Sequence, residues 1–275
     1  MLISFYRFWH GRLRLKGAGL IVRLLAPYFG SLQSFPLLLP EGQILRLDFR
    51  DVSAWYWVNY VLGDKLEEAG LVEAVCRASK PGDVIWDVGA NCGLFSYLLA
   101  RRLPDCRIIF FEPNRAVYEI ACAALQPFSQ VSGINIGLSC RKQDHVPLVV
   151  PSGGSAVGTV EPQVLGEGNY TLHVALDAGD RLVEQVGLPA PNTIKIDTEG
   201  HEADVLTGLA RTIANLKPMV FFEHISLSDD RVKKLVPFGF KLCSVSNRTG
   251  EFTMGFDRFV GHNSALLPES STLGS

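Results

Sequence analysis

The sequence of 275 residues lacks the cysteine patterns of a disulfide-rich or zinc-binding protein. Its six cysteines are scattered, with no CxxC pair and no histidine at the spacing of zinc ligands. In a chain of this size we expect buried thiols in a reducing compartment, which indicates the cytoplasm. A strong charge excess is also missing: the formal net charge is −2, so the overall charge does not indicate a nucleic-acid partner.

Residues 1–40 contain no acidic residue, but they carry both basic and apolar side chains. Basic residues and glycines interrupt the apolar stretches before any of them could span a bilayer or form a secretory signal. We expect residues 1–40 to form an amphipathic N-terminal extension. Two interpretations stay open: residues 1–30 contact an anionic membrane surface, or a helix packs on the main domain with its basic face in solvent. The basic residues are Arg7, Arg12, Arg14, Lys16 and Arg23.

From Val84 onward, short apolar runs alternate with helical patterns. This alternation predicts a Rossmann-like α/β domain over residues 41–261, with a mostly parallel sheet and helices on both faces. Strands are predicted at Gln43–Phe49, Val84–Val88, Arg107–Phe111, Ser132–Leu138, Thr193–Ile196, Met219–Phe222, Phe240–Val245 and Phe252–Val260, with two more between residues 144 and 175 around a Gly/Ser-rich loop. Helices are predicted at Asp51–Leu62, Lys65–Ser79, Leu94–Leu103, Arg115–Leu125, Asp177–Val186, Glu202–Leu216 and Asp229–Leu235. Residues 262–275, with Pro, Ser and Gly, are expected to be disordered.

The strand Val84–Val88 leads into a glycine-containing turn, Gly89-Ala90-Asn91-Cys92-Gly93, and a helix is expected directly after it. Glycines permit a tight turn and a close approach of the backbone to a ligand, as in the first loop of Rossmann domains. The third glycine of a dinucleotide fingerprint is missing, and Asp87 stands at the end of the strand. A carboxylate there suits an ammonium group and would repel phosphates. The turn therefore favours S-adenosylmethionine over NAD.

A second acidic position, Glu112, ends the strand Arg107–Phe111 and is followed by Pro113-Asn114. Ligands of open α/β sheets bind at the carboxyl ends of the strands, and the spacing from the glycine loop is near the ~20 residues expected. A carboxylate there suits the two ribose hydroxyls of an adenosine. The alternative is that Glu112 caps the following helix, a role for which Asn114 is the better candidate.

A third polar cluster follows the strand Thr193–Ile196, in the segment Lys195-Ile196-Asp197-Thr198-Glu199-Gly200-His201-Glu202. Acidic residues at the start of a helix interact well with its dipole, which accounts for Glu202 but less well for Asp197. The next strand ends at Glu223-His224, which adds a carboxylate and an imidazole at the same edge of the sheet. We expect these groups to converge on one site.

Taken in order, DVGANCG, FFEPN, IKIDTEGHE and VFFEH resemble the FkbM-type family of S-adenosylmethionine-dependent methyltransferases. The resemblance runs from about residue 43 to 260. It implies the class I methyltransferase fold, a seven-stranded sheet whose last strand is antiparallel, and O-methylation of hydroxyls on sugars or natural products. By this resemblance Asp87, Gly89, Ala90, Asn91 and Gly93 would form the cofactor loop, Glu112 and Asn114 would lie at the ribose, Asn135 and Leu138 near the adenine, and Asp197 at the methionine end.

Methyl transfer to a neutral hydroxyl needs an aligned acceptor and a base for its proton. The candidates are His201 and Glu199 first, then Asp197, Glu223 and His224. Asp197, Glu199 and Glu223 could also hold Mg²⁺, but the resemblance does not require a metal and we predict none. The expected acceptor is a small molecule or saccharide. Two other functions stay open: an NAD-dependent oxidoreductase, and a non-catalytic, membrane-recruited module with this fold.

Overall fold

The computed structural model describes residues 18–63, 66, 68–151, 158–160, 169–223, 239–254, 263–271 and 273 of the chain. The strands β3, β4, β5, β9 and β10 form the parallel part of a central sheet, and the order across it is β12-β11-β13-β10-β9-β3-β4-β5. This confirms the Rossmann-like α/β fold. The parallel strands are β3 (Val84–Val88), β4 (Arg107–Phe111), β5 (Val131–Ile134), β9 (Thr193–Ile196) and β10 (Met219–Glu223).

The antiparallel side of the sheet corrects one expectation about the end of the chain. Residues 262–275 are predicted to be disordered, yet β13 (Asn263–Pro268) lies antiparallel between β10 and β11 (Phe240–Val245), inside the sheet. The reason is the apolar run Ala265–Leu267, whose side chains are fully buried on both faces. The insertion of β13 makes the sheet eight-stranded instead of seven-stranded, and the strand predicted from Phe252 is the short edge strand β12 (Phe252–Met254).

Helices cover both faces of the sheet, because successive side chains of each strand point into two different cores. In β3, Ile85 packs with the α5 and α6 side, whereas Trp86 and Val88 pack with the α9 and α10 side. The predicted helix over residues 202–216 is divided at Leu209, where Gly208 approaches the carbonyl of Ser139 too closely for any Cβ. These helices are α5 (Ala69–Ala78), α6 (Leu94–Arg102), α7 (Arg115–Leu125), α8 (Gly179–Glu184), α9 (Glu202–Gly208) and α10 (Ala210–Leu216).

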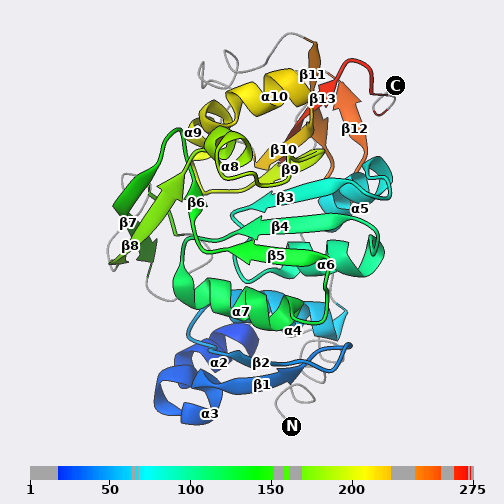
Figure 1. The fold of residues 1–275 in the computed structure, drawn as a ribbon. Helices are drawn as coiled ribbons and strands as arrows, with labels where there is room; N and C mark the ends of the chain where they lie inside the picture. Colours follow the sequence, from blue (N-terminus) through cyan, green and yellow to red (C-terminus); the bar gives the residue numbers. More distant parts are fainter. Residues whose placement is uncertain are drawn as a thin grey trace.

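A small three-stranded unit stands beyond the carboxyl ends of the parallel strands. It contains β6 (Gly137–Leu138), β7 (Gln143–Pro151) and β8 (Asn169–Asp177), in the order β6-β8-β7. Figure 1 shows β7 and β8 past the arrowheads of β3, β4 and β5. The predicted strand at residues 132–138 is therefore two strands in different sheets. The Gly/Ser-rich segment 152–157 and the predicted helix at residues 229–235 lie outside the described residues.

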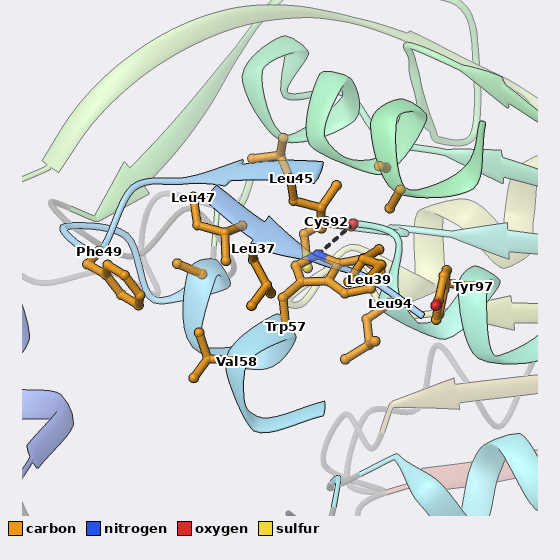
Figure 2. Packing of buried hydrophobic residues seen from close by; sticks show 14 of the residues in the cluster. Leu37, Leu39, Leu45, Leu47, Phe49, Trp57, Val58, Cys92, Leu94 and Tyr97 are labelled. Carbon is orange, nitrogen blue, oxygen red and sulfur yellow. Dashed lines mark hydrogen bonds between the residues drawn. The ribbon is translucent and has the colours of Figure 1, made fainter. Parts of the chain in front are cut away.

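The N-terminal elements pack on the domain beside the glycine loop. In α4, the buried Trp57 donates a hydrogen bond from Nε1 to the carbonyl of Cys92 at 3.3 Å, and Leu37 and Leu45 of the hairpin share its apolar cluster (Figure 2). This packing places α4 next to the carboxyl edge of the sheet. The elements are α2 (Ala18–Leu25), the 3-10 helix η2 (Ala26–Tyr28), α3 (Gly30–Gln33), β1 (Phe35–Leu38), β2 (Ile44–Leu47) and α4 (Ser53–Leu62).

Candidate active site

The glycine loop after β3 is held by contacts with neighbouring strands and helices. The N–H groups of Gly89 and Ala90 both donate to the carbonyl of Phe111 at 3.0 Å. Gly89 has φ +76°, and a Cβ there would lie 1.8 Å from the carbonyl oxygen of Asp197. Gly93 has φ +82°, and its Cβ would lie 2.8 Å from Cβ of Ala121. The two glycines are thus required by positive φ and by close approach to the protein itself.

Asp87 lies beneath this loop and lines neither of the pockets described below. It is fully buried, and its Oδ2 accepts a hydrogen bond from Ser96 Oγ at 2.7 Å. The ammonium of Lys195, opposite it in β9, lies 3.4 Å from Asp87 Oδ1 and 3.1 Å from Asp197 Oδ2, and donates to the Gly89 carbonyl at 3.2 Å. The ammonium that Asp87 meets in this structure is therefore the one on Lys195.

Lys195 is the buried counter-charge of two carboxylates. Burial lowers its pKa, but the charges of Asp197 and Asp87 outweigh burial and raise the pKa above its ordinary value. The residue is only 3% exposed, and it stays protonated inside the sheet because of these two carboxylates. A lysine within an otherwise apolar strand is visible in the sequence, but its partners depend on the order of the strands.

Glu112 is held at the end of β4 by two backbone groups. Its Oε2 accepts from the N–H of Asn91 at 2.9 Å and its Oε1 accepts from the N–H of Asn114 at 2.8 Å. Burial is the main reason why the pKa of Glu112 is raised to about 7. Asn114 is the N-cap of α7, accepting from the N–H of Ala116 at 3.2 Å. The capping role thus belongs to Asn114, and the Glu112 carboxylate faces a pocket.

The two residues expected near an adenine have different positions. Leu138, in β6, lines the same pocket as Glu112. The side chain of Asn135 donates from Nδ2 to the carbonyls of Glu112 at 2.7 Å and Pro113 at 3.1 Å. Asn135 therefore fixes the backbone that carries Glu112.

The loop after β9 is organised around Glu202, which was expected to act at the start of the following helix. Its Oε1 accepts from the N–H groups of Thr198 at 2.9 Å and Gly200 at 3.2 Å. Glu199 has φ +53°, and burial, with the nearby charge of Asp197, raises its pKa to about 7. Nε2 of His201 lies 3.0 Å from Ser139 Oγ. Glu223 ends β10, and His224 lies outside the described residues.

Two pockets meet at these loops. Four residues, Gly89, Asn91, Asp197 and Glu199, line both of them. The first pocket extends over the end of β4 to Glu112 and Asn114, and its apolar wall is formed by Leu138, Leu148, Val160 and Leu176. His201 lines only this pocket.

The second pocket extends from the shared residues toward α4. Its volume is about 500 Å³, within the range of small-molecule sites. Most of the polar and aromatic side chains that line it cannot be predicted from the sequence, because they come from distant segments without a shared motif. They are Trp55, Tyr56, Asn59, Glu68, Asn247 and Asn263.

Together these features define a Rossmann-like α/β protein with an acidic, two-pocket site at the carboxyl edge of its sheet. The methyltransferase FkbM domain family matches residues 87–242, and the chain belongs to that family. It is therefore an S-adenosylmethionine-dependent methyltransferase, as the resemblance implies. The match supports neither an NAD-dependent oxidoreductase nor a non-catalytic module.

The chain is also similar to individual known proteins. The chain is 27% identical to the hexuronic acid methyltransferase AglP of Haloferax volcanii, over 82% of this chain and 90% of that protein. It is 26% identical to the AMB antimetabolite synthetase AmbE of Pseudomonas aeruginosa, over 52% of this chain but only 8% of that protein. Among solved structures, methyltransferase FkbM from Methylobacillus flagellatus KT has a TM-score of 0.48 at 15% identity, and the match covers 90% of this chain and 60% of that one.

Proposed function

We propose that this chain methylates a hydroxyl of a saccharide, with S-adenosylmethionine in the first pocket and the acceptor in the second. The observation that carries the proposal is the junction: Gly89, Asn91, Asp197 and Glu199 line both pockets, so molecules held on the two sides meet there. Such a junction is what an in-line transfer between two bound molecules requires.

The residues of the first pocket fit the cofactor. Each Glu112 oxygen accepts one backbone N–H and keeps acceptor capacity for a ribose hydroxyl. The apolar wall of Leu138, Leu148 and Leu176 suits an adenine ring. At the junction, Asp197 would hold the ammonium of the methionine moiety, a role for which Asp87 is too deeply buried. When bound, the cofactor supplies an electrophilic methyl group.

Glu199 is our candidate for the base. It lines both pockets, and its pKa of about 7 matches the requirement for proton transfer near neutral pH. Its carboxylate would take the proton that the acceptor hydroxyl loses. We prefer it to His201, which lines only the first pocket and is paired with Ser139.

The second pocket supports a saccharide acceptor. The aromatic rings of Trp55 and Tyr56 offer flat apolar faces, and Asn59, Asn247 and Asn263 offer amide donors and acceptors, a combination that suits a sugar ring and its hydroxyls. The relative AglP is named a hexuronic acid methyltransferase, which agrees with this acceptor class.

The test has two stages. Calorimetric titration of the full chain with S-adenosylmethionine should give binding in the micromolar range, about −8 kcal/mol, and titration with NAD should give none. Transfer of a radiolabelled methyl group is then measured with neutral hexosides, hexosaminides and hexuronides, alongside a non-sugar hydroxyl compound. Cofactor binding with transfer only to the non-sugar compound would overturn the saccharide assignment. Binding of NAD alone would overturn the cofactor assignment.

A further inference from the structure

Most of the large apolar side chains that the described residues leave exposed lie in one segment, between Ile21 and Ile44. The exposed fractions reach 81% for Tyr28 and 63% for both Leu24 and Leu38. The elements that carry them, α2, η2, β1 and β2, gather at one end of the molecule (Figure 1). Contiguous exposed apolar surface on a globular protein marks an interaction site.

The helical part of this segment carries an apolar stripe on its outer side. Ile21, Leu24, Leu25 and Tyr28 are exposed and follow the i, i+3, i+4, i+7 spacing of one helix face. Val22 and Ala26, at i and i+4, are buried and dock the same turns on the domain. The helix is thus apolar on both sides, and the protein covers only one of them.

The β1–β2 hairpin repeats this arrangement. Leu37 and Leu45 are paired and buried in the core, whereas the neighbouring pair, Leu38 and Ile44, is 63% and 60% exposed. Each strand therefore presents apolar residues to both of its faces. A hairpin at a protein surface ordinarily alternates apolar and polar residues.

The charge of the surrounding sequence favours one kind of partner. Every charged side chain before Glu41 is basic, although the whole chain has a net charge of −2. The basic residues Arg12, Arg14 and Lys16 immediately precede α2, and Arg23 lies within it. Apolar side chains beside clustered basic ones are the signature of a helix lying in the interface of an anionic bilayer.

We infer that the α2–η2 stripe, formed by Ile21, Leu24, Leu25 and Tyr28, docks on the surface of a membrane that carries anionic lipid. The apolar side chains of the stripe enter the headgroup region, and the positive charge of the sequence before Glu41 favours anionic lipid. This inference concerns a surface that the catalytic proposal does not use. Among the described residues no helix is long and apolar enough to cross a bilayer.

The experiment is co-sedimentation of the full chain with vesicles of phosphatidylcholine alone and with added phosphatidylglycerol. The wild type should bind the anionic vesicles, bind the neutral ones far less, and be released by salt. The double variant Leu24→Gln/Tyr28→Gln should weaken binding at least about tenfold, because two apolar side chains no longer enter the interface. Both positions are exposed, so the fold is retained.

The matched control is Leu216→Gln, which changes a 54% exposed leucine on α10 and should leave vesicle binding unchanged. Three results would overturn the inference: no binding of the wild type to anionic vesicles, equal loss with the control, or no loss with the double variant. Analytical ultracentrifugation tests a second copy as the occupant of the stripe. A dimer that the double variant dissociates, without vesicle binding, would overturn the membrane assignment.

Discussion

The two pockets hold their acidic side chains in different ways. In both Glu112 and Glu199 the pKa is raised to about 7, chiefly by burial. Glu112 accepts two backbone N–H groups, whereas no hydrogen bond to the Glu199 carboxylate is found among the residues that the structure describes. Two carboxyl groups with the same raised pKa thus lie in different settings, and our proposal uses Glu112 as a fixed acceptor for the cofactor and Glu199 as the base where the pockets meet.

The largest effect that would test this difference is expected from Glu199→Gln. The variant keeps the size of the side chain but cannot take a proton, so kcat should fall about 10²–10⁴-fold while the Kd for S-adenosylmethionine changes little. Wild-type activity should rise with pH through about 7, as the carboxylate loses its proton. Steady-state kinetics and calorimetry measure the two quantities, with His201→Gln as the comparison. A larger loss of kcat in that comparison would move the base to His201.

Lys195→Met should have the next largest effect, on folding. Without the ammonium, Asp87 becomes a buried, uncompensated charge, which we expect to lower the free energy of unfolding by about 3–5 kcal/mol. Chemical denaturation measures the change, and Lys80→Met at an exposed lysine is the control. Adding Asp87→Asn should recover part of the loss. If it recovers none, the two residues are not coupled.

Glu112→Gln should act on cofactor affinity. The amide retains one acceptor oxygen and loses the charge, so the Kd for S-adenosylmethionine should rise roughly tenfold or more, as expected for a charge-assisted hydrogen bond. At saturating cofactor, kcat should stay close to that of the wild type. Glu119→Gln, at an exposed position on α7, is the matched control for calorimetry. A loss of kcat with an unchanged Kd for S-adenosylmethionine would contradict the assignment of the cofactor to the first pocket and of the acceptor to the second.

The last prediction concerns the pH dependence of folding that Glu112 contributes. Its pKa is about 7 in the folded chain and near 4.5 in the unfolded chain, so the folded state binds the proton more tightly. The resulting stability is fully present below about pH 4.5 and is lost as the pH rises through about 7, by up to about 3 kcal/mol. Thermal unfolding of the wild type and of Glu112→Gln, compared across this range, measures it. Parallel curves for the two proteins would contradict the prediction.

The parallel strands were the most predictable part of the fold. β3, β4 and β9 occupy the predicted ranges because each is a short buried apolar run with a clear stop after it. β13 was missed because Pro, Ser and Gly near the end of the chain obscured the apolar run Ala265–Leu267. β1 was missed because Pro36 lies within it, which an edge position in a two-stranded sheet permits.

The site was predictable to the extent that it depends on parallel strands. Glu112, Asp197 and Glu199 converge because the carboxyl ends of neighbouring parallel strands lie at one edge. The burial of Asp87 against Lys195 could not be predicted from the sequence, because such a prediction requires knowing that β3 and β9 are adjacent. The second pocket was equally hidden, because Trp55 and Asn247 come together only through tertiary packing.

The position of β13 has a consequence for biosynthesis. This strand follows β10, β11 and β12 in the sequence but separates β10 from β11 in the sheet. During translation, therefore, β10 has only β9 and β11 has only β12 as a final neighbour until residue 268 has left the ribosome. Until then this apolar edge of β10 stays unpaired, so chaperones can bind it and other strands can pair with it incorrectly. The lining of the second pocket is complete only after this late insertion, because Asn263 in β13 is part of it.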